Sequence, residues 1–428
     1  MNTVNKDRKR PSKHYNAKRK NNTNNNQPTN TSRPANNSRP IRGKSKKSEK
    51  TIDLSLLVKT AKLKEEVKYQ ANRTFAEFPL HPSLLNKVKD KGYINPTEIQ
   101  DKTIEQILDH KNLLGIAQTG TGKTAAFLLP IINQLIDSRR NNHALIVVPT
   151  RELALQVDEE FKSLTKGLNL FSNCFIGGIN INRDKQALRR PTHITIGTPG
   201  RILDLMQQRL LDLRQVNTLV LDEFDRMLDM GFINDVKKVL AAMHNRKQTL
   251  LFSATLDKSQ QNLIDDILVK YDTVKVSTGN TSTENVEQSI VKLEKNDIKF
   301  EVLLDLLYNK EFDRVILFEE TKHKVKRLCA QLNKAGFKAE EIHGNKSQNA
   351  RQTALDMFKK GKSNILVATD VAARGIDIDD VSHVINYQVP GSYDTYIHRI
   401  GRTGRAGKIG KAITLVDNDK WQNNRRAV

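Results

Sequence analysis

Short apolar runs alternate with segments of helical periodicity from Phe75 almost to the end of the chain. Uninterrupted aliphatic runs of this length are typical of strands that are buried on both faces of a parallel sheet. The predicted strands fall into two sets: Asn112–Ile116, Ala144–Val148, Ile194–Ile196, Thr218–Leu221 and Gln248–Phe252, then Arg314–Phe318, Asn364–Ala368, His383–Asn386 and Ala412–Val416. Two consecutive β/α sets predict an α/β protein with two doubly wound parallel-sheet domains.

The domain limits follow from changes in composition along the chain. We expect a disordered basic tail at 1–50 and a lead-in at 51–74, where Leu and Val at helical spacing from Ile52 to Ala71 predict an amphipathic helix. The first domain is expected at 75–276, a Thr/Ser/Gly/Asn-rich linker at 277–287 and the second domain at 288–417. Residues 418–428 form a short C-terminal tail, in which Trp421 either caps the second sheet or belongs to a frayed end.

Charge is the strongest signal in the composition. The chain has 71 Lys and Arg against 48 Asp and Glu, a net charge of +23, and a balance of this sign favours a polyanionic partner such as nucleic acid. Residues 1–50 hold 15 of these basic residues against only Asp7 and Glu49. So little apolar surface predicts disorder, and the tail is either a solubilising segment or, as we favour, a nonspecific tether for nucleic acid.

Other features suggest an intracellular protein. Cys174 and Cys329 lie far apart and fit no disulfide or metal spacing, no apolar run is long enough to span a membrane, and the N-terminus lacks a secretory signal. We therefore expect no membrane association and a location in the cytoplasm, or in the nucleus if the source is eukaryotic.

The most specific motif is the Gly/Thr turn that follows the first predicted strand. Its residues are Ala117, Gln118, Thr119, Gly120, Thr121, Gly122, Lys123 and Thr124. In a strand–loop–helix context, backbone N–H groups can surround phosphate oxygens, Lys123 can reach the β and γ phosphates, and Thr124 can bind Mg²⁺. The first glycine of the usual phosphate-loop pattern is replaced by Ala117.

Two further segments complete a candidate catalytic set. Asp222 and Glu223 follow the strand Thr218–Leu221, where one carboxylate can hold Mg²⁺ and the next can orient the attacking water. Near the C-terminus, the segment from His398 to Arg405 offers guanidinium groups that could neutralise charge in a phosphoryl-transfer transition state.

Together these segments resemble the DEAD-box family of superfamily 2 RNA helicases over residues 75 to 416, with every family motif in order. The resemblance implies two tandem RecA-like domains and hydrolysis of ATP with Mg²⁺ on RNA. It assigns catalysis to Lys123, Asp222, Glu223, Arg402 and Arg405, and Mg²⁺ binding to Thr124 and Asp222. It assigns ATP binding to the phosphate loop Ala117–Thr124 together with Phe75, Thr97, Gln100, Gly375 and Asp377, with Phe75 stacking on adenine and Gln100 reading its edge.

The same resemblance implies an RNA-backbone surface and a coupling network. The RNA contacts would be Pro149, Thr150, Arg151, Gly178, Thr198, Gly200, Arg201, Gln348, Arg351 and Thr369. The coupling residues would be Asp225, Ser253, Thr255 and His398. Backbone and ribose contacts imply weak sequence preference and RNA over DNA.

Phe224 departs from the family pattern, which has Ala at that position, and it raises the question of how hydrolysis is coupled to unwinding. We expect a monomeric RNA helicase that unwinds short duplexes or remodels RNA–protein complexes, with ribosomal precursors or the RNA-degradation machinery as candidate assemblies. The alternatives are an RNA-stimulated clamp without unwinding, and an RNA-binding scaffold with an inactive ATP site. The second would require a missing catalytic residue.

Overall fold

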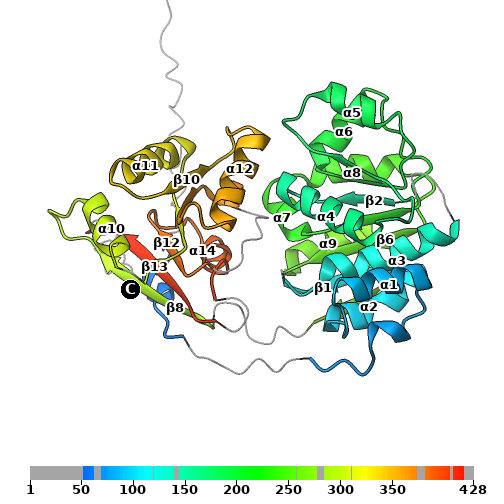
Figure 1. The fold of residues 1–428 in the computed structure, drawn as a ribbon, viewed down its shortest axis with the longest axis horizontal. Coiled ribbons are helices and arrows are strands. Elements are labelled where there is room, and N and C mark those ends of the chain that lie inside the picture. The colour runs from blue at the N-terminus through cyan, green and yellow to red at the C-terminus, as the bar shows by residue number, and fades with distance from the viewer. Residues whose placement is uncertain are drawn as a thin grey trace, which may run out of the picture. The chain divides into compact units, whose positions relative to one another are not determined.

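The computed structural model describes residues 52–61, 69–118, 120–138, 144–256, 258–276, 284–309, 311–373, 381–404 and 408–418. These residues form two α/β domains (Figure 1). The predicted tail at 1–50 lies outside the described residues, and so do most of the linker and all of the C-terminal tail after residue 418. Among the described helices, none is long and apolar enough to cross a membrane.

The first domain is built on a seven-stranded parallel sheet with the strand order β3-β4-β2-β5-β6-β1-β7. The strands are β1 (Asn112–Ile116), β2 (Ala144–Val147), β3 (Ser172–Phe175), β4 (Ile194–Gly197), β5 (Thr218–Leu221), β6 (Gln248–Ser253) and β7 (Tyr271–Lys275). Every residue of β2, β4, β5 and β6 is buried, because helices cover both faces. The predicted parallel sheet is confirmed for this domain.

Two hydrophobic layers hold those helices in place. One layer packs α1 (Pro82–Asp90), α2 (Glu98–Leu108), α3 (Lys123–Ser138) and α4 (Arg151–Leu164). The other packs α6 (Pro199–Gln207), α7 (Phe224–Asp229), α8 (Ile233–Ala242) and α9 (Lys258–Ile267), with α5 (Ile181–Ala187) beside them. Helices on both faces define the doubly wound arrangement.

The second domain has a six-stranded sheet with the order β10-β11-β9-β12-β13-β8, again with parallel neighbours. Its strands are β8 (Val286–Lys292), β9 (Val315–Phe318), β10 (Ala339–Ile342), β11 (Ile365–Ala368), β12 (His383–Asn386) and β13 (Gly410–Val416). Its helices are α10 (Lys299–Leu307), α11 (Lys322–Lys334), α12 (Gln348–Lys359), α13 (Asp370–Ala373) and α14 (Tyr393–Ile400). β8 begins at Val286, inside the predicted linker.

The lead-in segment differs from the amphipathic helix that its spacing predicts. Its described residues form a short 3₁₀ turn, η1 (Leu54–Leu57), followed by extended backbone at Lys59, while residues 62–68 lie outside the described ranges. Lys59 exchanges two backbone hydrogen bonds with Gln288 of β8, at 3.0 and 2.8 Å. Leu54 and Leu57 are buried against Tyr396 and Ile400. The segment therefore lies along the edge of the second sheet (Figure 1).

Parallel strands place the predicted motifs at one end of each sheet. The phosphate loop follows β1, residues 149–151 follow β2, residues 198–201 follow β4, residues 222–225 follow β5 and residues 253–255 end β6. In open α/β sheets this carboxyl edge is where ligands bind.

Candidate functional site

The phosphate loop has the strand–turn–helix form that its sequence predicts. Gly120 and Gly122 have φ angles of +85° and +91°, which residues with a Cβ rarely adopt. Lys123 is the first residue of α3, and its Nζ donates a hydrogen bond to the Ala117 carbonyl at 2.8 Å. Thr121 Oγ1 donates to the Gln118 carbonyl at 2.7 Å. Hydrogen bonds from the side chains of Thr121 and Lys123 to carbonyls of the same loop therefore stabilise its conformation. Thr119 lies outside the described residues.

Gln100 joins the predicted adenine segment to this loop. Its Oε1 accepts a hydrogen bond from the Thr97 backbone N–H at 2.8 Å, and its Nε2 donates to the Gly122 carbonyl at 3.1 Å. A Cβ at Gly122 would lie 2.4 Å from that Nε2, so the close approach requires glycine. Phe75 is only 3% exposed and packs against Phe78 and Tyr93, so in this structure its ring belongs to the core.

Asp222 and Glu223 are buried where β5 ends. Burial raises the pKa of Asp222 to about 6, the positive charge of Lys123 opposes that rise, and the negative charge of Glu223 adds to it. Glu223 has a φ of 53° and precedes α7, and its carboxylate forms a 2.7 Å ion pair with Arg226. A left-handed conformation at a glutamate is uncommon and is typical of functional turns.

The predicted coupling residues of the first domain are brought together. Asp225 Oδ2 accepts hydrogen bonds from the backbone N–H and the Oγ1 of Thr255, at 3.2 and 3.1 Å. Ser253 Oγ donates to the Thr255 carbonyl at 2.6 Å. Phe224 takes no part in these bonds, because its ring is buried in the hydrophobic layer under α7. The end of β5 is thus linked to the end of β6 through Asp225.

The predicted RNA-backbone residues of the first domain lie at helix starts and a glycine turn. Pro149 precedes Thr150, which caps α4 by accepting a hydrogen bond from the Leu153 N–H at 3.3 Å. Arg151 lies against Gly178, whose φ is +80°. Thr198 precedes α6, which contains Gly200 and Arg201. The Arg201 guanidinium is buried and bonds to carbonyls and carboxylates inside the domain.

In the second domain, Gln348 and Arg351 lie in the first turn of α12, which Ser347 caps, and both side chains are buried. Thr369 follows β11 and precedes α13. Gly375, Asp377 and Arg405 lie outside the described residues.

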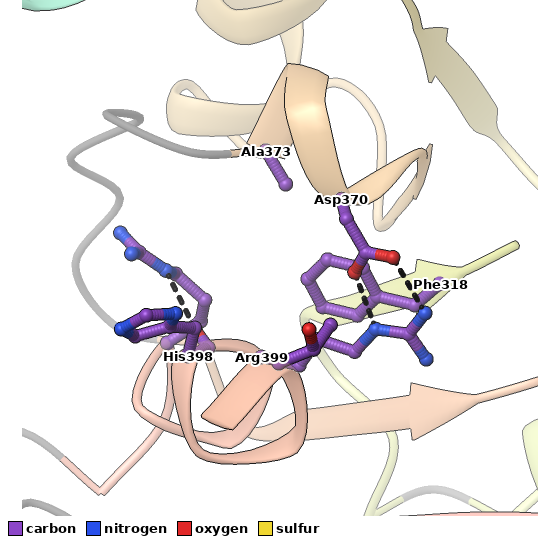
Figure 2. Close-up of a pocket in the computed structure, with 7 residues that line it drawn as sticks. Phe318, Asp370, Ala373, His398 and Arg399 are labelled. Atoms are coloured by element: carbon purple, nitrogen blue, oxygen red, sulfur yellow. Dashed lines mark hydrogen bonds and ion pairs between the residues drawn. The ribbon is translucent and has the colours of Figure 1, made fainter. Parts of the chain in front are cut away.

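A pocket in the second domain gathers residues from β9, α13 and α14 with Arg402 just beyond (Figure 2). Figure 2 shows Asp370 and Arg399 facing each other beside Phe318. Arg399 Nε and Nη2 donate hydrogen bonds of 2.5 and 2.9 Å to the two carboxylate oxygens of Asp370. Arg399 Nη1 also donates to Asn386 Oδ1 and to the Gln388 carbonyl. His398 lies next to Arg399, and the His398 carbonyl accepts a 3.4 Å hydrogen bond from Arg402 Nε.

Sequence reasoning gave no individual role to three charged residues of these sites, Asp184, Arg226 and Asp370, and included Arg399 only as part of the basic segment from His398 to Arg405. Only Arg226 could have been identified from the local sequence. It follows Glu223 by three residues at the start of a helix, and oppositely charged side chains at this spacing can form an ion pair. The partners of Asp184 and Asp370 are distant in the sequence, so no local pattern could have identified them.

Comparisons with known proteins agree with this arrangement. A family model described as DEAD/DEAH box helicase matches residues 97–263, and one described as helicase conserved C-terminal domain matches residues 298–407. Among solved structures, S. cerevisiae Dbp5 bound to RNA and ADP BeF3 aligns with a TM-score of 0.72 and 31% identity, covering 83% of this chain and 92% of Dbp5. Mss116 bound to ssRNA and UDP-BeF aligns with a TM-score of 0.71 and 32% identity, covering 81% of this chain and 75% of Mss116.

Sequence relatives give the same result. The chain is 44% identical to the ATP-dependent RNA helicase CshA of Listeria monocytogenes over 80% of its own length, but it spans only 66% of that protein. It spans 62% of the DEAD-box ATP-dependent RNA helicase CshA of Bacillus cereus, at 42% identity. The Methanocaldococcus jannaschii protein "Probable ATP-dependent RNA helicase MJ0669" is 43% identical, and the match covers 84% of this chain and 95% of that protein. With two parallel-sheet domains, the ordered motifs and these relatives, the chain belongs to the DEAD-box helicase family.

Proposed function

We propose that this protein is an RNA-dependent ATPase that uses ATP to open short RNA duplexes or to remodel RNA–protein complexes. The observation that carries the proposal is the cluster of Lys123, Asp222 and Glu223, all buried, at the carboxyl edge of one sheet beside a glycine loop. The family and the RNA-bound and nucleotide-bound neighbours support the same substrates.

ATP is the proposed nucleotide. Lys123 would bind its β and γ phosphates together with the loop N–H groups. Gln100 would read the adenine edge, because its amide can donate and accept at the same time. If so, Gln100→Ala should weaken use of ATP more than use of GTP. Equal use of the two nucleotides by the unaltered protein would refute the base assignment.

The residues present fit a bound Mg²⁺. The buried Asp222 carboxylate has a pKa raised to about 6, so its ionised form would gain from a nearby cation. Thr124 and Asp222 would hold the ion together with phosphate oxygens and water, since Mg²⁺ in phosphate sites usually takes few protein ligands. When bound, Mg²⁺ would neutralise part of the phosphate charge.

The chain's own residues would then act in fixed roles. Glu223 would orient and deprotonate the attacking water, and its ion pair with Arg226 would set its direction. Arg402 and Arg405 would neutralise the γ-phosphate charge when the two domains close on ATP and RNA. A site completed only on closure would make hydrolysis depend on RNA.

Phe224 in the Asp-Glu-Phe-Asp sequence should leave these chemical roles unchanged. We propose that coupling to RNA runs through Asp225 and Thr255, whose hydrogen bonds do not involve the aromatic side chain.

The decisive experiment measures ATP hydrolysis with and without RNA, together with displacement of a short RNA duplex. We expect stimulation by RNA, and we expect Glu223→Gln to retain ATP and RNA binding but lose about 10²-fold or more in turnover. Asp229→Asn is the matched control, because Asp229 is exposed on the same helix α7. Near-normal turnover in Glu223→Gln, or no response to RNA in the unaltered protein, would contradict the proposal.

A further inference from the structure

Arg151 and Arg201 approach the same glycine turn of the first domain, but their guanidinium groups are in different situations. The turn, Ile176–Ile179, joins β3 to α5 and contains Gly177 and Gly178. Arg151 comes from α4, and Arg201 comes from α6. The family resemblance places both side chains on RNA, so the structure can separate their roles.

The Arg201 guanidinium binds both ends of the turn. Its Nε donates a hydrogen bond to the Ile176 carbonyl at 3.2 Å, and its Nη2 donates to the Ile179 carbonyl. These two carbonyls directly flank Gly177 and Gly178. With Nη1 bonded to Asp204 Oδ2 at 3.1 Å, each of the three guanidinium nitrogens has a partner inside the domain. The Arg201 side chain therefore links the two ends of the Gly177–Gly178 turn by hydrogen bonds.

Asp184 supplies the buried counter-charge for this arginine. Asp184 lies in α5, is only 5% exposed, and places its Oδ2 3.0 Å from Arg201 Nε. Burial raises the pKa of Asp184, and the charge of Arg201 opposes that rise. Asp204, the other carboxylate on this guanidinium, is 42% exposed and is screened by water. A buried guanidinium is costly unless it is paired, and Asp184 supplies a buried negative charge beside Arg201 through an ion pair in which Oδ2 forms no hydrogen bond.

Arg151 is in the opposite situation. Its guanidinium lies so close to Gly178 that a Cβ there would come within 2.4 Å of Nη1. Among the residues the structure describes, no hydrogen bond or ion pair engages this guanidinium. Burial lowers the pKa of Arg151, the carboxylate of Glu152 opposes that shift, and the positive charge of Arg201 adds to it. An anion bound here would relieve that repulsion, as an RNA phosphate would.

We propose that Asp184 is a positioning residue for RNA-backbone binding: it holds Arg201 under the Gly177–Gly178 turn, so that the turn and Arg151 meet the phosphate. Arg201 then acts by shaping the turn, with its guanidinium occupied inside the domain. This inference rests on the proposed RNA-dependent function, because it names which side chains of that site bind and which position.

The test uses Asp184→Asn, which keeps the shape of the side chain and removes its charge. We measure binding of a fluorescent single-stranded RNA, the RNA concentration for half-maximal ATPase, the saturating rate, and the KM for ATP. We expect RNA binding to weaken about five- to fifty-fold, with the saturating rate and the KM for ATP within two-fold of the unaltered protein. The matched control is Asp204→Asn, which removes the exposed partner of the same guanidinium and should change RNA binding less than two-fold.

A double-mutant cycle with Arg151→Gln separates positioning from an independent contact. If Asp184 acts through the turn and Arg151, Asp184→Asn should weaken RNA binding less in the Arg151→Gln background than in the unaltered protein. Multiplying effects would overturn the proposal, and so would unchanged RNA binding in Asp184→Asn or a parallel loss of ATP binding. An unaltered protein that binds RNA without ATPase stimulation would refute the proposed function, while the binding data would still decide the role of Asp184.

Discussion

At the scale of single residues, five charged groups are buried at the ends of β1 and β5: Lys123, Asp222, Glu223, Asp225 and Arg226. Burying an ionised group is costly unless it is paired. Glu223 and Arg226 offset this cost for each other through their 2.7 Å ion pair. Asp222 forms no ion pair of this kind with any residue that the structure describes, and its pKa is raised to about 6 by burial. The site therefore keeps a carboxylate whose charge opposes folding.

This cost predicts that Asp222→Asn stabilises the nucleotide-free protein while abolishing turnover. The folded-state pKa lies above the ordinary 3.8, so ionisation of Asp222 reduces stability progressively as the pH rises from about 4 through about 6. Above that window, the variant should gain about 1–3 kcal/mol in free energy of unfolding of the first domain. Urea titrations at pH 5 and pH 7.5 measure the difference, which should be larger at pH 7.5. A variant less stable than the unaltered protein at both pH values would show that the charge is already compensated.

Phe224 gives a second prediction at this scale. Its ring is 1% exposed within the core layer, so Phe224→Ala should lower the free energy of unfolding of the first domain by about 3–5 kcal/mol. Phe224→Leu should cost about 1 kcal/mol and keep RNA-stimulated hydrolysis within a few-fold. Duplex displacement per ATP hydrolysed is measured in parallel. A large loss of hydrolysis in the stable Phe224→Leu variant would assign the ring a direct role in coupling.

The site was predictable from the sequence where its chemistry is local. The phosphate loop, Asp222 and Glu223 each follow a recognisable strand, and the fold places them at the same edge of the first sheet. Asp184 and Asp370 were missed because each pairs with an arginine that only the fold brings near, 17 and 29 residues away respectively. Phe75, which the resemblance assigns to adenine stacking, packs against Phe78 and Tyr93 in this structure, and its role toward the nucleotide stays a prediction.

At the scale of elements, the sequence predicted the central strands and missed the edge strands. The central strands, such as β2, β5, β9 and β11, are buried throughout and appear as aliphatic runs. The four strands that were not predicted, β3, β7, β8 and β10, are the four edges of the two sheets. Edge strands are partly exposed, and the polar residues of β7 and β8 reflect this. Burial on both faces, not strand formation itself, produced the detectable pattern.

Two neighbouring leucines of the turn η1 allow a comparison of a buried and an exposed side chain at the edge of the second sheet. Leu57 is fully buried against Val286 and Tyr396, whereas Leu56 of the same turn is 50% exposed. Leu57→Ala should therefore destabilise the second domain by about 2–5 kcal/mol, and Leu56→Ala should change its stability by at most about 0.5 kcal/mol. Hydrogen exchange of the β8 and β13 amides reports the effect directly. Equal exchange rates in the two variants would mean that the lead-in does not hold this edge.

At the scale of the whole molecule, positive charge is unevenly distributed along the sequence. Residues 1–50 hold 15 of the 71 basic residues and only two of the 48 acidic ones, while the proposed catalytic groups lie in the two α/β domains. Recruitment of RNA and hydrolysis of ATP could therefore be separated by truncation. The terminal segment would bind additional phosphates without adding sequence information, since dispersed Lys and Arg neutralise phosphates irrespective of the base.

Deleting residues 1–50 should weaken binding to single-stranded RNA at low salt and flatten the dependence of affinity on salt. Removing the neutralisation of one phosphate reduces the log–log slope by about 0.7. Because the composition of the segment predicts disorder, we expect only part of its charge to bind RNA at once and the change to be equivalent to a few phosphates. The saturating rate of hydrolysis should be unchanged, because Lys123, Asp222 and Glu223 remain in place, while the RNA concentration for half that rate should rise. A full-length variant with the Lys and Arg residues of the segment changed to Gln is the control for chain length and should behave like the truncation. Salt titrations of the three proteins decide the matter, because superimposable slopes would leave the segment with a solubilising role alone.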